Sequence, residues 1–536
     1  MSTATPADQL SKLSRVHELP LVPYRFRGIP RAIQLALALS GKINDPGITM
    51  RDTGEIFRIP YPRLRRPLQE ITDVWIDGWT GETVMITSPR LVRELFDLPE
   101  GQVDHEAWKK FLMFLLGAQT PFVLGGADHV RVRRALAAEL TPARVETYRQ
   151  RSVQRLDDMV DELPLHTAVA LHDFYTRFTQ DIILRAVFGW DDCADLAELR
   201  VALYDASRYY SAVKTRRMFA YMLNCSITLN PRKNPADLPR RDDRLSPRFA
   251  RTGHRLQLRA DELIYRKIEE LRTRPNDSVA ARLIEFGNRE NPAWTDKRLR
   301  DIIATLLVAG HDTSVIAYSW STQYLLHNPG PRAELVAEAR AGLTDRYAQA
   351  VNTEALRMHS PVIGTLPFPA KQNIALGGYR IRKGTFIFAP ATPLHYNVHL
   401  YPAPETFRPE RWFDTKPDRH GFIPFGIGPH RCPGSTFYLV EAGIVMHRLF
   451  GRLDMQPCRR RVDRARWMFG TLSRPKSDTE VIISRRRPAS QVPWYQPGRD
   501  DPPTPLKEAL LPPHHDAPEP DTSDRPRCPF RISANT

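Results

Sequence analysis

Residues 425–434, FGIGPHRCPG, place one cysteine, Cys432, among glycines and prolines just before an apolar segment of helical character. A thiolate is a strong, soft ligand for iron, and a helix N-terminus with free backbone N–H groups stabilises the anion. Gly426, Gly428 and Gly434 let the backbone approach a flat cofactor, because a Cβ atom would stand in the way. Phe425 is placed to keep water from the sulfur, which tunes a metal's potential. The stretch predicts an iron-binding thiolate, with a buried structural cysteine as the alternative.

A second stretch with chemical character lies within the segment 295–327, whose pattern predicts one long helix. Apolar positions at three- and four-residue steps put Thr313 on the buried face, with small residues one turn away. Gly310 costs such a helix about 1 kcal/mol relative to alanine. Asp312 and Thr313 both prefer to hydrogen-bond their own backbone, so the helix interior disfavours them. Because these residues destabilise the helix locally, their presence indicates a functional role. The alternative is that Thr313 is hydrogen-bonded to the backbone carbonyl four residues back and that Asp312 lies on the surface.

An acid and two arginines form a third pattern. Glu354 and Arg357 are three residues apart in TEALRMHSP and share one helix face. As an exposed ion pair they would mean little for stability. The later loop FRPERW brings Arg411 as a third member. The pattern predicts a structural triad of these three residues.

Helices dominate the elements that must position these residues. Nearly everything between about 105 and 360 reads as helix, including FYTRFTQDIILRAVFGW and RADELIYRKIEELRTR. EIFRIPYP and then DVWIDGWTGETVMITSP alternate apolar and polar residues around a Thr80–Gly81 turn, which predicts a hairpin or a small sheet. Ser88–Pro89 then opens a helix. Short strands are expected in IALGGYRIRKGTFIFAP and in VIISRRR near 481. The fold class is therefore mainly α with small β regions, an α+β architecture with a long central helix.

Composition sets the domain organisation. The chain has 536 residues, 42% of them hydrophobic, so a sizeable core is expected. Residues 50–487 form the predicted folded domain, preceded by a segment 1–49 that is either packed on the domain or, through its basic amphipathic stretch YRFRGIPRAIQLALAL, held at a bilayer surface. Residues 488–536 hold 12 prolines in 49 residues and are predicted to be a disordered tail. The chain shows no secretory signal and no expected membrane span.

The net charge of +16 raises the question of nucleic acid. The basic clusters at 240–259, 459–466 and 485–487 lack interleaved aromatic residues and any DNA-binding motif. Solvated faces and docking of an acidic protein are favoured, and no nucleic-acid partner is expected. The five cysteines form no CxxC pair, which favours a reducing, cytoplasmic setting.

Taken together, these stretches resemble the cytochrome P-450 superfamily, in its soluble bacterial form. FGIGPHRCPG is similar to the haem-binding signature, and AGHDTS (309–314) to the oxygen-activating stretch of the long central helix. Glu354 and Arg357 match the ExxR pair, and FRPERW matches the loop that carries the third arginine. The match runs from about 50 to 485 and implies a triangular, helix-rich domain with small antiparallel sheets.

The resemblance also implies how haem b is held. Cys432 is the implied axial ligand of the iron, with Phe425, Gly426, Gly434, Ala309 and Gly310 lining the cofactor. His129 and Arg133, four residues apart, resemble the haem-propionate contacts of soluble members, and His430 resembles a further one. Relatives often carry an arginine near Phe368, whereas this chain has only Lys371 downstream. Ser314 stands where a second threonine is common.

The implied activity is insertion of one oxygen atom from O2 into an apolar organic substrate. Asp312 and Thr313 are the implied proton relay, and Gly310 leaves space in the helix. Electrons are expected from a ferredoxin or flavodoxin with its reductase, because no flavin, nicotinamide or iron–sulfur motif is present, and arginines 459–466 are proposed for docking. The alternatives are a same-fold coupling enzyme, peroxygenase or isomerase, then a non-catalytic haem sensor, then a nucleic-acid-binding protein. Segments 105–120, 208–229, 362–368 and 468–472 are expected to line the substrate pocket with the central helix.

Overall fold

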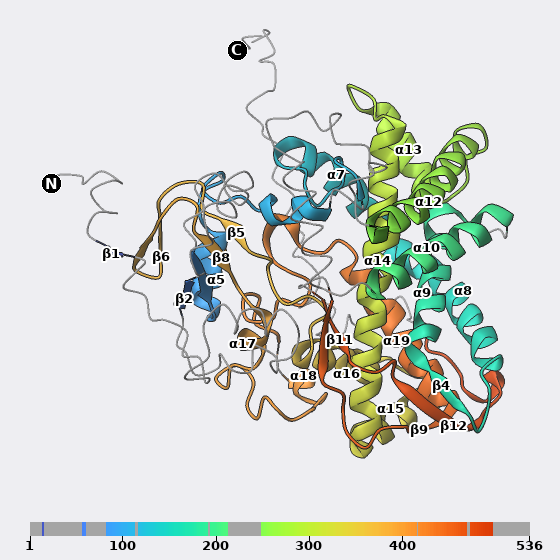
Figure 1. The fold of residues 1–536 in the computed structure, drawn as a ribbon. Helices are drawn as coiled ribbons and strands as arrows, with labels where there is room; N and C mark the ends of the chain where they lie inside the picture. The colour runs from blue at the N-terminus through green and yellow to red at the C-terminus, as the bar shows by residue number, and fades with distance from the viewer. Residues whose placement is uncertain are drawn as a thin grey trace, which may run out of the picture.

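The computed structural model describes residues 13–15, 56–60, 82–112, 116–190, 193–212, 248–414, 416–468 and 472–496. Helices build most of this part of the chain, as Figure 1 shows. The α-helices are α5 (Pro89–Phe96), α7 (Gly126–Glu139), α8 (Pro142–Asp161), α9 (Leu171–Phe188), α10 (Ala194–Ala212), α12 (Arg248–Thr273), α13 (Val279–Arg289), α14 (Asp296–His327), α15 (Pro329–Ala341), α16 (Arg346–Met358), α17 (Ala391–His395), α18 (Arg411–Asp414) and α19 (Ser435–Arg452). Short 3-10 turns are η2 (Ala107–Leu112), η4 (Gly428–His430) and η5 (Ala489–Gln491).

Helix α14 is the long axis of the molecule. It begins where the Thr295 hydroxyl accepts the Arg298 backbone N–H at 3.2 Å, and it ends just before Pro329. Its length of 32 residues corresponds to about 48 Å. Figure 1 shows α14 crossing the whole domain, with α8, α9, α10, α12 and α13 on one side and most of the strands on the other. It is long and apolar enough to cross a membrane, and 67% of its most apolar window is buried in the protein, as expected of a core helix.

The described strands form four small sheets. Their strands are β1 (Ser14–Arg15), β2 (Ile56–Pro60), β3 (Glu82–Ile86), β4 (Ala168–Ala170), β5 (Phe368–Pro369), β6 (Ile374–Leu376), β7 (Tyr379–Ile381), β8 (Phe386–Phe388), β9 (Leu453–Pro457), β10 (Ala465–Met468), β11 (Leu472–Pro475) and β12 (Glu480–Arg486). The sheet orders are β1-β7-β6, β2-β3-β8-β5, β4-β12-β9 and β10-β11. Most pairs are antiparallel, as expected, but β3 pairs with β8 and β1 with β7 in parallel.

The start of helix α5 follows its sequence signals. Ser88 precedes the helix with extended backbone, and its hydroxyl accepts the Leu91 N–H at 3.3 Å. Pro89 occupies the first helical position, where a missing N–H costs nothing. Strands β2 and β3, which precede α5, pair antiparallel as predicted, while the expected turn at Thr80–Gly81 lies outside the described residues.

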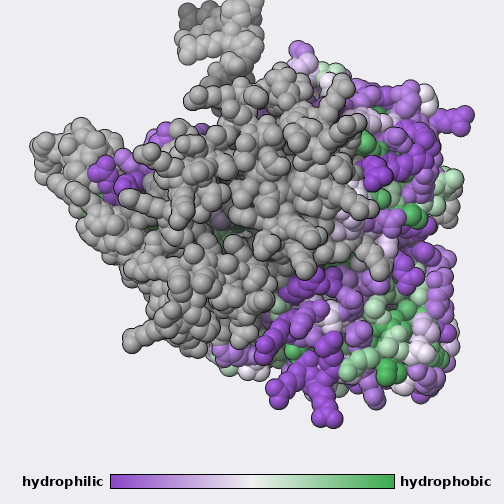
Figure 2. Space-filling model, viewed as in Figure 1, coloured by the Kyte–Doolittle hydropathy of each residue, from purple (hydrophilic) through white to green (hydrophobic). Residues whose placement is uncertain are grey.

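The largest core cluster joins α8, α9, α14, α16 and α19. Its fully buried aromatic side chains include Trp320 and Trp412. A second cluster lies between α7, α9, α12, α13 and the first half of α14, and a third packs α5 on the β-sheet side. Figure 2 shows mostly hydrophilic side chains over the described part of one face, with apolar residues in small patches. The predicted central helix is therefore enclosed by apolar packing along most of its length.

The predicted boundary at residue 488 is too early. Val492 is only 1% exposed, and its carbonyl accepts a hydrogen bond from Arg448 of α19. A Cβ on Gly451 would lie 2.7 Å from the Val492 side chain, so this helix is packed directly against the segment. The folded part thus continues to about residue 494, because these residues cover the end of α19 despite their proline-rich composition.

Candidate functional site

The loop before α19 holds Cys432 by backbone contacts. The Cys432 N–H donates to the Phe425 carbonyl at 2.8 Å, and the Arg431 N–H donates to the Gly428 carbonyl at 3.0 Å. Gly426 and Gly428 both have φ near +72°, a conformation that side chains disfavour. A Cβ on Gly428 would also collide with the Phe96 ring at 2.6 Å. These two glycines therefore shape the loop itself, in addition to any role beside a cofactor.

The Cys432 sulfur lies in an unusual environment. Its side chain is exposed, yet the surrounding protein still desolvates the thiol. Burial raises the pKa of the thiol, while the Gly434 N–H and the charges of Arg133 and Arg431 act in the opposite direction. A thiolate here therefore needs a further cation. The soft donor, its exposure and the N–H aimed at it fit a haem iron.

Cys432 is followed by Pro433, then Gly434 as N-cap, then Ser435 as the first residue of α19. Pro433 therefore lies just outside the first turn of α19. Gly434 has no positive φ, and a Cβ there would sit 3.8 Å from the Cys432 sulfur, an ordinary contact. The ring of Phe425 packs on Tyr438 of α19 with centroids 5.7 Å apart.

His129, Arg133 and His430 come together beside this loop. The rings of His129 and His430 lie 4.1 Å apart, and Arg133 donates to the Arg431 backbone carbonyl. Burial, followed by the neighbouring cationic groups, lowers the pKa of His129 to about 4 and that of His430 to about 3. Both rings are therefore neutral at pH 7. A neutral imidazole has one N–H to donate, so the His129 ring can serve a carboxylate while Arg133 carries the charge.

Three further polar residues of this cluster escaped sequence reasoning. Glu106 accepts from His430 Nε2 at 3.0 Å, and the His105 ring lies 4.7 Å from Phe368. Lys109 is 7% exposed, and burial lowers its pKa to about 8. Among the described residues, no carboxylate or carbonyl pairs with its ammonium. The sequence did contain a signal, the dense run of titratable residues in VDHEAWKK, but this run matches no known motif.

In the middle of the largely buried helix α14, Leu306, Ala309, Gly310 and Thr313 form a half-buried stripe, and Val308 and Asp312 are half-buried beside it. The Thr313 hydroxyl donates to the Ala309 carbonyl at 2.9 Å, which is the backbone contact anticipated as the structural alternative. A Cβ on Gly310 would sit 3.2 Å from the Ile183 side chain of α9. The space that this glycine leaves is thus used first for close packing of α9 and α14.

Asp312 is not a free surface carboxylate. It is 25% exposed and lies 3.1 Å from Nε2 of the preceding residue, the buried His311. On the far side of the helix, Ser314 donates to the Gly310 carbonyl at 3.2 Å. Asp312 and Thr313, the acid and the alcohol predicted for the proton relay, are therefore consecutive residues of α14. Asp312 is paired with the His311 ring, whereas Thr313 is hydrogen-bonded to the Ala309 carbonyl.

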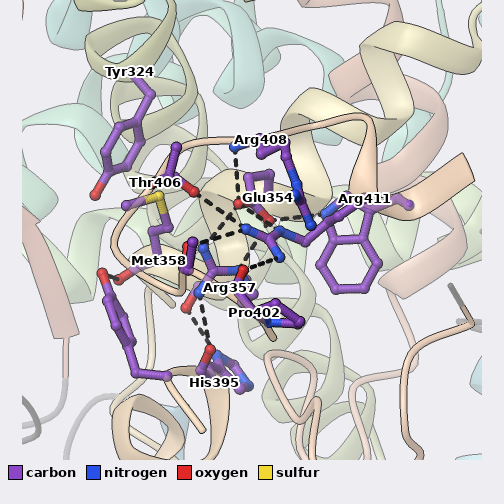
Figure 3. Close-up of polar contacts among 12 residues, drawn as sticks. Tyr324, Glu354, Arg357, Met358, His395, Pro402, Thr406, Arg408 and Arg411 are labelled. Atoms are coloured by element: carbon purple, nitrogen blue, oxygen red, sulfur yellow. Dashed lines mark hydrogen bonds and ion pairs between the residues drawn. The ribbon is translucent and has the colours of Figure 1, made fainter. Parts of the chain in front are cut away.

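Glu354 is the centre of a buried cluster, drawn in Figure 3. Its carboxylate accepts two hydrogen bonds from Arg357, at 2.9 and 2.8 Å, and one from Arg411 at 2.9 Å. Trp412 Nε1 donates at 3.0 Å and the Arg408 backbone N–H at 3.1 Å. Glu354 has no exposed surface, and Arg357 is 1% exposed. The cluster fixes the loop 402–412 onto α16.

Burial determines how much the Glu354 cluster contributes to stability. An exposed pair would have carried little weight, whereas a buried carboxylate with five donors is costly to break. The third guanidinium nitrogen of Arg357, Nη1, donates to the His395 carbonyl at 2.9 Å, as Figure 3 shows. Arg411 reaches backbone carbonyls as well, including that of Pro402 at 3.1 Å. The structure brings the three predicted triad members together and adds Trp412.

A second buried acid, Glu441 of α19, was not singled out in the sequence. Tyr318 of α14 donates to its carboxylate at 2.5 Å, and burial raises the pKa of Glu441 to about 7. The other Glu441 oxygen and the Tyr438 hydroxyl are buried without a hydrogen-bond partner among the described residues. The rings of Tyr318 and Tyr438 stack 5.7 Å apart. This cluster connects the helix of the proposed proton relay to the helix that follows Cys432.

Other predicted segments are only partly described. Val362 forms an isolated bridge with Leu472, so two of the expected pocket segments are neighbours. Residues 213–247, 113–115 and 469–471 lie outside the described residues, and most of the expected segment 208–229 is among them. The arginines at 459–466 follow β9, beyond an 18-residue helix that is about 27 Å long. His327 at the C-terminal end of α14 contacts the Arg459 carbonyl at 3.0 Å, so this group lies far along both helices from the Cys432 loop.

The chain is similar to known proteins in sequence and in fold. A family model described as Cytochrome P450 matches residues 64–482. Cytochrome P450 135A1 of Mycobacterium tuberculosis is 27% identical over 401 residues, 74% of this chain and 83% of the relative. Cytochrome P450 139 of Mycobacterium bovis is 26% identical over 417 residues, 72% and 89% of the two chains. A mutant cytochrome P450DA heme domain superposes with a TM-score of 0.66 at 19% identity, covering 88% of this chain and 98% of that one, which is a likeness of fold.

Proposed function

Since the chain belongs to the cytochrome P450 family of haem b-dependent monooxygenases, we propose that Cys432 is the axial thiolate and that the substrate is an apolar organic molecule. When bound, the haem supplies activation of O2 with two electrons received one at a time. The observation that carries the assignment is the Cys432 sulfur itself, which is exposed and accepts the Gly434 N–H.

The axial assignment is tested by Cys432→Ser. The reduced carbon monoxide complex of the variant should lose the long-wavelength band that thiolate ligation produces. Cys193→Ser and Cys458→Ser are matched controls, because both cysteines are exposed and lie in other elements. The assignment fails if the band survives in Cys432→Ser or disappears in either control.

Thr313 and Asp312 are proposed to manage protons at the oxygen-binding side of the haem. Thr313 now donates to the Ala309 carbonyl, so its hydroxyl oxygen retains lone pairs and can turn its proton toward a new acceptor. Thr313→Ala should still consume reductant but release several times more hydrogen peroxide per electron pair. Thr313→Ser, which keeps the hydroxyl, is the control and should stay close to the wild type. Equal peroxide yields in all three proteins would contradict the role.

The haem propionates are proposed to lie against the His129, Arg133 and His430 cluster. Phe368 is near the place where relatives often carry an arginine, and we propose that the buried Lys109 supplies the positive charge instead. The charge of Lys109 lowers the pKa of both histidines, which places its ammonium within electrostatic range of their rings. A carboxylate partner would offset the desolvation cost of burying that ammonium.

Haem loss to an excess of apomyoglobin tests this role of Lys109. Lys109→Met should release haem about tenfold faster than the wild type, because a charge-assisted contact is lost. Lys371→Met is the control, since Lys371 is exposed and is the lysine that the sequence offers downstream of Phe368. Equal rates for Lys109→Met and Lys371→Met would remove Lys109 from the haem site.

Electrons are proposed to come from an acidic ferredoxin or flavodoxin with its reductase. The docking face is better placed beside the Cys432 loop than at 459–466, because Arg133 of α7 contacts that loop directly. Arg134, next on α7, is exposed and available for a partner. Arg134→Gln should slow reduction at low salt, whereas Arg460→Gln, also exposed, should not. If Arg460→Gln slows reduction and Arg134→Gln does not, the docking face lies at the arginines 459–466 instead.

The substrate class is proposed from apolar residues in the expected pocket segments, as for a fatty acid, terpenoid, steroid or aromatic polyketide. Incubation of the holoprotein with a panel of these classes should move the haem band where a member displaces water from the iron. A panel of small polar acids and sugars is the control. Shifts only with the polar panel would contradict an apolar substrate.

A further inference from the structure

His311, one residue before Asp312, is a buried histidine with both ring nitrogens engaged. It is 2% exposed. Its Nδ1 lies 2.8 Å from the Leu307 carbonyl, and its Nε2 lies 3.1 Å from Asp312 Oδ1. The same Nε2 lies 3.4 Å from the amide nitrogen of Gln180 on α9. The ring is thus fixed between two helices, directly behind the carboxylate of the proposed proton relay.

These contacts define where the protons are. A carbonyl only accepts, so Nδ1 carries a hydrogen. The carboxylate of Asp312 also accepts, so Nε2 donates to it when the ring is doubly protonated. Burial opposes the charged ring, but the charge and hydrogen bond of Asp312, together with the Leu307 carbonyl, outweigh it and raise the pKa of His311. His311 and Asp312 therefore form a buried imidazolium–carboxylate pair.

Gln180 can serve either protonation state of the ring. Its amide nitrogen faces His311 Nε2, which suits a neutral ring that accepts a hydrogen bond. Its amide oxygen is buried without a hydrogen-bond partner among the described residues. Half a turn of the amide exchanges the two atoms and presents the oxygen to a protonated Nε2. The side chain is thus an adaptable partner for a ring that gains and loses a proton.

The other charged groups of this region do not compete for the ring. His172 of α9 is held neutral, because burial and then Arg474 lower its pKa to about 4. Arg474 of β11 contacts His172 Nε2 at 3.0 Å and is paired with Asp478. Asp312 is the charged group that acts directly on His311.

We propose that His311 is a positioning residue and proton store for Asp312. This inference rests on the proposed function of Asp312. The Nε2 proton passes to Asp312 Oδ1, leaving a neutral ring that keeps its Nδ1 hydrogen and an uncharged carboxylic acid. The bare Nε2 then accepts from the Gln180 amide. The store refills through Asp312, the more exposed member of the pair at 25%.

The test uses His311→Gln and Gln180→Glu in the holoenzyme. His311→Gln retains a donor for Asp312 but cannot store a proton. Gln180→Glu is nearly isosteric and adds a carboxylate facing the ring, which raises the pKa of His311 further. The readout is hydrogen peroxide formed per NADPH consumed from pH 5.5 to 9, with a ferredoxin and reductase as electron supply and no added substrate.

The wild type should release more peroxide as pH rises through the His311 pKa. In Gln180→Glu the midpoint should move up by about one pH unit, a tenfold lower proton concentration. In His311→Gln the peroxide fraction should be high and independent of pH. A midpoint unchanged in Gln180→Glu, or a pH-dependent limb retained in His311→Gln, would overturn the proposal.

A second readout separates this inference from the proposed function. A histidine whose pKa is raised on folding stabilises the protein fully below pH 6.5, and that stability is lost as pH rises through the folded pKa. The melting temperature of the wild type relative to His311→Gln should therefore fall between pH 6 and 9. A flat difference would reject the protonated pair even if the carbon monoxide band of thiolate ligation is present. If instead the band is absent and the difference falls, the proposed function fails and the pair stands.

Discussion

Glu441→Gln probes the cost of burying an acid between α14 and α19. The pKa of Glu441 is raised by burial from its ordinary 4.5 to about 7. The folded state therefore favours the protonated acid, so stability is highest below pH 4.5 and falls as pH rises toward 7. At 1.36 kcal/mol per pKa unit, the full cost at pH 8 is about 3 kcal/mol. Glutamine removes that cost and keeps an oxygen for the Tyr318 hydroxyl.

The expected gain is measurable by calorimetry of the holoenzyme. An unfolding entropy of about 2.1 cal/mol/K per residue over a chain of this length converts 3 kcal/mol into about 3 °C. The melting temperature of Glu441→Gln minus that of the wild type should grow by about 2 °C between pH 5.5 and pH 8.

Glu285→Gln is the matched control. Glu285 lies on the surface of α13, its side chain 67% exposed, so its substitution should give a difference that does not change with pH. The reasoning is refuted if the Glu441→Gln difference stays constant across this range, because an acid that is already ionised in the folded state gains nothing from glutamine.

Three other perturbations follow from the packing. Glu354→Gln should lower the yield of haem-loaded protein sharply, because removing one partner of a buried ion pair costs about 3–5 kcal/mol; recovery of normal yield and melting temperature would show that the cluster is dispensable. Gly428→Ala should destabilise by about 2 kcal/mol or more through its positive φ and its clash with Phe96, and calorimetry of that variant with Phe96→Leu should recover only the part due to the clash. Gly310→Ala should be rescued by Ile183→Val if helix packing explains the glycine, and peroxide yields that remain high in the double variant would favour a role beside the haem instead.

Local signals in the sequence were sufficient for much of the fold. The helical residue pattern of the segment 295–327 predicted the limits of α14 to within a residue. Ser88 and Pro89 predicted the start of α5. The predicted fold class, mainly α with small sheets, is confirmed by the structural likeness to a cytochrome P450 heme domain.

The remaining features depend on contacts between distant residues, which no local pattern reports. The parallel pairing of β3 with β8 joins segments about 300 residues apart. The sequence suggested Arg411 as a partner of Glu354 but not the burial of the pair, which decides its energetic weight. No local pattern indicated that the fold brings the Lys109 charge close to His129 and His430. The packing of Val492 on α19 overrode a composition typical of disorder.

The Glu354 cluster also constrains how the chain is made. Trp412 donates to a carboxylate 58 residues earlier, so the acid on α16 has no complete set of donors while that stretch is still untranslated. At about 5–20 residues per second, the ribosome needs several seconds to supply it. During that interval the Glu354 carboxylate of α16 lacks part of its hydrogen-bond donors, so it remains exposed to water. The centre of the molecule is thus closed late in synthesis, and polypeptides stopped between 354 and 412 should be substrates for proteolysis.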